Sequence, residues 1–245
     1  MTMAKHKRGL ARTQTALLPP SVEDYVGAHA LVRVIDLYVD GLDMVALGFK
    51  KSVALDEGRP PYAPDDLLKL YLYGYWNRIR TSRKLEAECK RNLELIWLLG
   101  TLSFDHKTIA DFRRENAKPF KAVCSQFVQF LREAQLVGGE APVVAVDGSK
   151  FKACASKASL VSAEQVVKRR AQDRRLMRLR SATVEHPFGN LKAMMPGGFL
   201  LRTLPKVQGE MALAVLTYNL KRALNILGFE NLMRQLKMIP ALGSA

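Results

Sequence analysis

Cysteine and histidine are scarce, and their scarcity excludes several classes of protein. The three cysteines, Cys89, Cys124 and Cys154, are odd in number and widely spaced. That pattern is typical of reduced thiols and argues against a disulfide framework or a zinc knuckle. The four histidines are equally scattered, so the sequence predicts no His/Cys metal site.

Long apolar runs are also missing. No stretch reaches the roughly 20 continuous apolar residues that a membrane span requires. The first 20 residues are basic, with Lys5, Lys7 and Arg8 and no acid, and they lack the apolar centre of a signal peptide. We therefore expect a cytoplasmic protein with no membrane partner.

Acidic residues are few relative to basic ones. The 38 Lys and Arg against 23 Asp and Glu give a formal net charge of +15. A balance of this kind favours a polyanionic partner, nucleic acid before a membrane surface. With 48% hydrophobic residues, a chain of 245 residues can nevertheless bury a core.

The order of patterns predicts four regions. A flexible basic arm over 1–20 precedes a helical domain over 21–137, and a glycine pair at 138 and 139 separates it from a segment over 142–228; a helix and tail follow over 229–245. In the helical domain, Pro64 opens one helix, Ser82 and Asp105 cap two others, and Pro119 closes the Asp105 helix. A further helix covers 120–135, and a long one covers 208–227. We expect these core side chains: Leu67, Leu70, Tyr71, Tyr73, Trp76, Phe127 and Phe130.

A short apolar strand at 143–147 ends on Asp147, where Gly148 frees the backbone to turn. Open α/β sheets place their chemistry at such strand ends, although an Asp that merely begins a turn fits the spacing equally well. The next segment is the most basic part of the chain, since residues 149–181 hold ten Lys and Arg against two acids.

Basic side chains recur elsewhere on predicted short helices. Three such helices with loops between them could form a DNA reader like a helix-turn-helix, or the charges could simply solvate a helical bundle. We expect these side chains to contact nucleic acid: Lys5, Lys7, Arg8, Arg78, Arg80, Arg83, Lys84, Arg113, Arg114, Lys150, Lys168, Arg169, Arg170, Arg174, Arg175 and Arg178.

Four motifs in this order carry a family resemblance: DHKTIADFRREN at 105–116, VVAVDGSKFKA at 143–153, VEHPFGNLK at 184–192, and GEMALAVLTYNLKRALNILG at 209–228. Together they resemble the DDE transposases of bacterial insertion sequences. The resemblance implies a helical N-terminal domain followed by an RNase H-like α/β domain. Asp147 and Glu185 would then be catalytic carboxylates that hold Mg²⁺, and Lys192 the lysine seven residues after the glutamate. The expected partners are the double-stranded DNA of transposon ends and a second copy or a full-length transposase.

The spacing of the two acids departs from this family. An RNase H-like core needs roughly 40 residues or more between them, by average element lengths, whereas only residues 148–184 intervene here. No apolar strand ending in Asp lies among them, and Glu164 and Asp173 are the acids available as a third ligand. The sequence therefore predicts a mainly α protein with a remnant of the RNase H-like domain, left by an internal deletion. Binding of Mg²⁺ is doubtful without the missing Asp, so the chain would be catalytically defective. The alternatives are a non-catalytic DNA-binding remnant and an unrelated basic RNA-binding scaffold.

Overall fold

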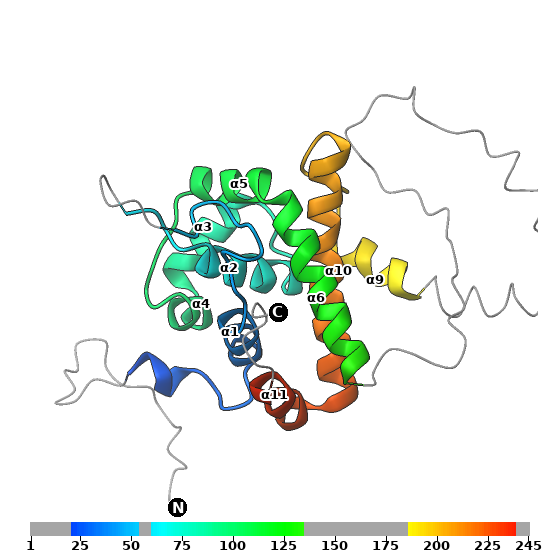
Figure 1. The fold of residues 1–245 in the computed structure, drawn as a ribbon. Helices are drawn as coiled ribbons and strands as arrows, with labels where there is room; N and C mark the ends of the chain where they lie inside the picture. The colour runs from blue at the N-terminus through cyan, green and yellow to red at the C-terminus, as the bar shows by residue number, and fades with distance from the viewer. Residues whose placement is uncertain (1–20, 54–59, 135–185, 239–245) are drawn as a thin grey trace, which may run out of the picture.

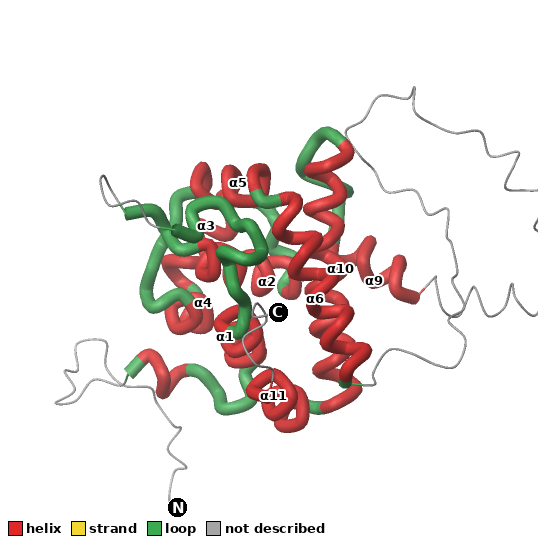
Figure 2. Tube along the Cα trace, viewed as in Figure 1, coloured by secondary structure: helices red, strands yellow, loops and turns green. Residues whose placement is uncertain are grey.

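The computed structural model describes residues 21–53, 60–134 and 186–238, and within these ranges the chain is helical with no strand. Figures 1 and 2 show the helices gathered into one body. The elements are a 3-10 turn η1 (Val22–Tyr25) and the helices α1 (Leu31–Asp40), α2 (Pro64–Trp76), α3 (Ser82–Arg91), α4 (Leu93–Leu98), α5 (His106–Glu115), α6 (Ala117–Glu133), α9 (His186–Met194), α10 (Leu204–Leu227) and α11 (Phe229–Met238). The prediction of a mainly α fold is confirmed.

Local sequence signals fix most helix starts. The Asp105 carboxylate accepts hydrogen bonds from the backbone N–H groups of Lys107 and Thr108, both at 2.9 Å, as an N-cap should. Pro64 is the first residue of α2, as predicted, and Asp65 and Asp66 follow in its first turn. There the missing N–H of proline costs no helical hydrogen bond, and carboxylates face the positive end of the helix dipole.

Several predicted boundaries differ from the structure, two of them at helix caps and ends. Ser82 is the first residue of α3, and Thr81 occupies the N-cap position. Pro119 does not close α5, which ends at Glu115; it lies in the first turn of α6. Proline is tolerated in a first turn because the N–H groups there have no carbonyl partner within the helix.

The core is centred on α2, which is buried on almost every side. Six of the seven predicted core side chains are buried, namely Leu67, Leu70, Tyr71, Tyr73, Phe127 and Phe130. Trp76 is the exception, because it is the last residue of α2 and stays partly exposed. It packs against the edge of the core and leaves part of its ring at the surface.

The C-terminal helices complete this core. Helix α10 runs beside α6 (Figure 1), and its Leu213, Leu216 and Leu220 are fully buried in the same cluster as the side chains of α2 and α6. Gly209 allows the close approach, since a Cβ there would lie 2.5 Å from the Ala117 Cα atom. The long helix begins at Leu204, earlier than the predicted 208, with Pro205 in its first turn. The prediction for α11 is confirmed.

The predicted strand 143–147 and the basic segment 149–181 lie outside the described residues. The structure therefore does not test the RNase H-like remnant. In the described ranges, no helix is long and apolar enough to cross a membrane.

Candidate nucleic-acid interface

Arg80 lies inside the protein, only 4% exposed, and is bound by groups from distant parts of the chain. Its guanidinium donates to the carboxylate of Glu210 at 2.7 Å and to the carbonyl of Gly198 at 2.5 Å. Glu210 is fully buried and also accepts hydrogen bonds from the N–H groups of Leu200 and Leu201. A buried charge needs such partners, so Arg80 holds the loop before α10 against the end of α2.

Arg113 is buried beside this pair. Its guanidinium donates to the Arg80 carbonyl at 3.0 Å and lies 5.7 Å from the centroid of the Tyr71 ring. Burial acts to lower the pKa of Arg113, but Tyr71, Tyr75 and Glu210 outweigh it, and the pKa is raised. The expectation that Arg80 and Arg113 contact DNA is at odds with this burial, because a phosphate cannot reach either guanidinium in this fold.

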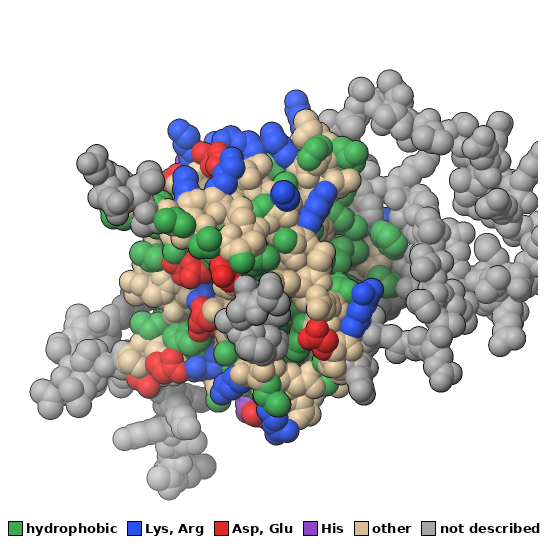
Figure 3. All heavy atoms as spheres, viewed as in Figure 1, with side chains coloured by type: hydrophobic (Ala, Val, Ile, Leu, Met, Phe, Trp, Pro, Cys, Tyr) green, Lys and Arg blue, Asp and Glu red, His purple; other side chains and the backbone are tan. Residues whose placement is uncertain are grey.

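The cations of α3, and those of α5 other than Arg113, are at the surface, but several are paired. Lys90 and Arg91 bind Glu86 and Glu88 one turn away, and Arg114 binds Asp111 and Glu115. Figure 3 shows Lys and Arg side chains over α5 with acidic side chains among them. Arg83 and Lys84 are exposed on α3 and have no ion pair with the described residues. The positive field of this face is therefore partly cancelled.

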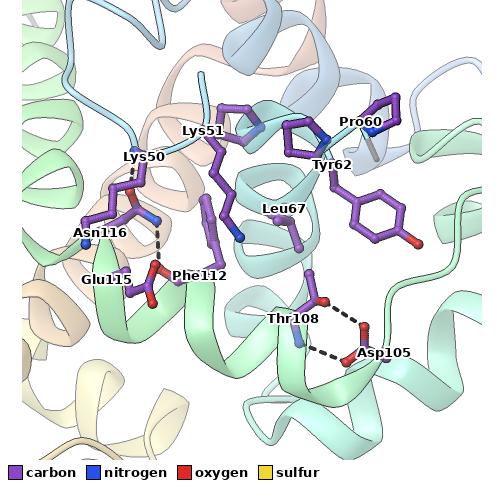
Figure 4. Close-up of a pocket in the computed structure, with 12 residues that line it drawn as sticks. Lys50, Lys51, Pro60, Tyr62, Leu67, Asp105, Thr108, Phe112, Glu115 and Asn116 are labelled. Atoms are coloured by element: carbon purple, nitrogen blue, oxygen red, sulfur yellow. Dashed lines mark hydrogen bonds between the residues drawn. The ribbon is translucent and has the colours of Figure 1, made fainter. Parts of the chain in front are cut away.

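A pocket of about 380 Å³ lies between the loop after α1, the start of α2 and α5. Figure 4 shows the Lys51 side chain directed into it, with Asp105 and Glu115 on the wall formed by α5. The Lys50 N–H donates to the side-chain oxygen of Asn116 at 2.9 Å. Because two lysines face two carboxylates here, the pocket has no charge preference that would select a nucleic acid.

A second pocket, of about 190 Å³, has a different lining. It lies where the end of α2 meets α9 and α10, and α9 packs beside α10 (Figure 1). Its walls contain three cations, two aromatic rings and no carboxylate. The lining residues are Trp76, Arg78, Asn190, Ala193, Met194, Tyr218, Lys221, Arg222 and Asn225. Its lining is therefore positively charged, unlike that of the first pocket.

Of the residues expected for catalysis, the structure places only Lys192. It is exposed in the last turn of α9, and Pro187 lies in the first turn of that helix, as the spacing requires. Asp147 and Glu185, the expected ligands of Mg²⁺, lie outside the described residues. So do these expected DNA contacts: Lys5, Lys7, Arg8, Lys150, Lys168, Arg169, Arg170, Arg174, Arg175 and Arg178. Within the ranges that are described, no group of three His, Cys, Asp or Glu could hold a metal ion.

Sequence reasoning missed both Glu210 and the second pocket. Glu210 could have been noticed as a lone carboxylate in the apolar run of α10, and a buried carboxylate requires a cationic or hydrogen-bonding partner. The pocket had a periodic signal, since residues 218, 221, 222 and 225 follow the i, i+3, i+4, i+7 spacing of one helix face. That face of α10 is polar along two turns of the helix.

The described chain is thus a helical protein with a buried ionic network and a cationic surface pocket. Residues 20–115, which include η1 and α1 to α5, match the family model of a transposase domain, DUF772. This match supports a transposase family for the chain. No curated protein and no solved structure matches the chain.

Proposed function

We propose that this chain is a DNA-binding protein of the transposase type that neither cleaves nor joins DNA by itself. The match of residues 20–115 to a transposase domain carries the proposal, because transposases act on DNA. The net charge of +15 supports it, since neutralisation of backbone phosphates releases counterions and drives nonspecific binding. Exposed cations such as Arg78, Arg83 and Lys84 would supply these contacts.

Binding to duplex DNA should weaken steeply with salt. If Z phosphates are contacted, log K should fall with log salt at a slope of about −0.9Z. The measurement is fluorescence anisotropy of a labelled duplex between low and moderate salt, with single-stranded RNA of equal length as the comparison. Affinity that does not change with salt would contradict the proposal, and a preference for the RNA would favour an RNA-binding scaffold.

The second part of the proposal concerns the catalytic residues. By resemblance, the chain retains Asp147, Glu185 and Lys192 but lacks the second Asp. Mg²⁺ supplies a Lewis acid when it is bound, but two carboxylates hold the ion weakly, and a two-metal site requires a third. Cations close in sequence, at 174, 175 and 178, would disfavour a divalent ion further.

A cleavage assay tests this part. The native chain is incubated with Mg²⁺ and transposon-end DNA, beside a variant that carries a full-length relative's middle segment grafted between Ser159 and Val167. We expect nicking only from the graft. If the native chain nicks the DNA and Asp147→Ala abolishes that activity, then a residue such as Glu164 or Asp173 completes the site.

The same spacing of the acids favours a second function, in which the chain pairs with a full-length transposase and inhibits it. The test adds this chain to an active relative and measures strand transfer at fixed DNA concentration. Pairing requires inhibition that persists when DNA is in excess. Inhibition that disappears under excess DNA reports competition for the ends alone.

A further inference from the structure

The small pocket between α2, α9 and α10 is assembled from three separate pieces of the chain. Tyr218, Lys221, Arg222 and Asn225 form one stripe on α10, and Asn190 lies on the adjoining face of α9. The third wall is the end of α2, with Trp76 and Arg78. The polar side chains therefore converge because the core fixes the three helices and the turn that follows α2.

The cations of this pocket have no acidic partner among the residues that the structure describes. Arg78, Lys221 and Arg222 form no ion pair with any described residue, and no carboxylate lines the pocket. The ammonium group of Lys221 lies 5.4 Å from the centroid of the Trp76 ring. A cation–π contact of this kind holds the charge at the pocket. Three unneutralised positive charges close together favour an anion.

The backbone at Arg78 gives independent support. Arg78 follows the cap of α2 with φ of +62°, and it is one of four non-glycine residues with positive φ in the described ranges. Glycine is the usual residue at this helix position, because a side chain with a Cβ is strained in the left-handed region. An arginine here therefore carries a strain that glycine would avoid, which is typical of functional positions.

We propose that this pocket binds a phosphate group through Arg78, Lys221 and Arg222. Its volume of about 190 Å³ is smaller than the roughly 300 Å³ or more of pockets that hold a drug-sized ligand. A single phosphate with part of its sugar fits that size better than a complete cofactor does. The phosphate comes from the DNA backbone or from a small phosphate compound. The first source rests on the proposed DNA-binding function and gives it a location.

The test compares the native protein with Arg78→Gln/Arg222→Gln and with Arg234→Gln/Lys237→Gln. The latter pair removes the same charge from the exposed face of α11. For duplex DNA, we expect the pocket variant to reduce the magnitude of the salt slope by about 1 and the affinity roughly tenfold. The control should change affinity by less than about threefold, since Arg234 and Lys237 are exposed and do not line the pocket.

Inorganic pyrophosphate distinguishes the two sources. Trp76 is one of only two tryptophans, so its emission can be followed alone in a Trp97→Phe background. A change on titration with pyrophosphate that is absent in the pocket variant, without any DNA binding, identifies a small phosphate ligand and contradicts the DNA function. DNA binding with equal salt slopes in both variants overturns the pocket and leaves the DNA function standing. Failure of both probes on the native protein overturns both.

Arg78→Gly covers the case in which the double variant does not fold. Glycine relieves the left-handed strain and removes the guanidinium, so this variant should melt higher while binding DNA more weakly. A purely structural role for Arg78 predicts that melting temperature and affinity change in the same direction. Higher melting temperature with unchanged affinity would contradict the pocket.

Discussion

The regions at the two ends of α2 carry opposite charges, and these charges are neutralised to different extents. In the second turn of α2, Lys69 lies between Asp36 and Asp40 of α1, at 2.6 Å from each carboxylate, so one cation neutralises two acidic side chains. The segment just after α2 is basic: Arg80 is neutralised by a buried Glu210, while Arg78, two residues earlier, has no acidic partner among the described residues. Density of charge in the sequence therefore does not distinguish an arginine that is buried in an ion pair from one that is exposed and unpaired.

Of the substitutions that test this comparison, removal of Glu210 should reduce the free energy of unfolding the most. Glu210→Ala leaves the buried Arg80 guanidinium without its carboxylate, and the loss of one partner of a buried pair costs about 3–5 kcal/mol. Urea unfolding followed by circular dichroism measures the change. Glu230→Ala, which removes an exposed carboxylate on α11, is the control and should change stability by less than about 0.5 kcal/mol. If Glu210→Ala lowered the free energy of unfolding no more than Glu230→Ala does, the position of Arg80 would not depend on the Glu210 carboxylate.

Gly209→Ala should weaken the packing that brings Glu210 to Arg80. The new Cβ would lie 2.5 Å from the Ala117 Cα and 2.6 Å from its Cβ, so α6 and α10 must separate. Overpacking of this kind costs about 2–3 kcal/mol. Gly189→Ala is the matched control, because its Cβ meets no atom within 4 Å and alanine favours a helix by about 0.5–1 kcal/mol. Thermal melts of the two variants should move in opposite directions.

Lys69→Met tests the acidic end. The substitution preserves most of the side-chain volume but leaves Asp36 and Asp40 without their cation. Because both carboxylates are partly exposed, we expect a loss of about 2 kcal/mol at neutral pH, less than for a fully buried pair. Urea unfolding at low and high salt checks the cause: the loss should shrink at high salt, which screens partly exposed ion pairs. A loss that does not depend on salt would indicate a packing effect alone.

Substitution of Asp66 should change stability the least, and it should stabilise the fold where the other substitutions destabilise it. Burial, followed by the neighbouring Asp65, raises the pKa of Asp66 to about 6. The folded state therefore prefers the protonated form, and the contribution of this group to stability is lost as the pH rises from 4 to 6. Asp66→Asn should stabilise the fold by about 1 kcal/mol at pH 8, after allowance for partial exposure, and by progressively less below pH 6. Glu133→Gln, at the exposed end of α6, should show no such trend.

The sequence predicts the features that depend on nearby residues. The N-cap of Asp105, the proline start of α2 and the bounds of α11 follow from groups within a few positions, so they can be read directly. Burial of Arg80 depends on a carboxylate 130 residues later, and the basic run around it gives no sign of that contact. A similarly long sequence separation explains why the pocket was missed. Arg78 and the polar stripe of α10 are far apart in the sequence, and only the packing of the core brings them together.

The hydrogen bonds of Glu210 also show that the region matched by the family model is smaller than the unit that folds. The family match ends at residue 115, before α6 and α10, yet Tyr75 and Arg80 within the match share the Glu210 carboxylate. A fragment cut at the family boundary would retain a buried guanidinium, lose its counter-charge and expose the apolar face of α2. A recombinant protein limited to the matched residues should therefore be insoluble, and the shortest useful piece must contain both α6 and α10.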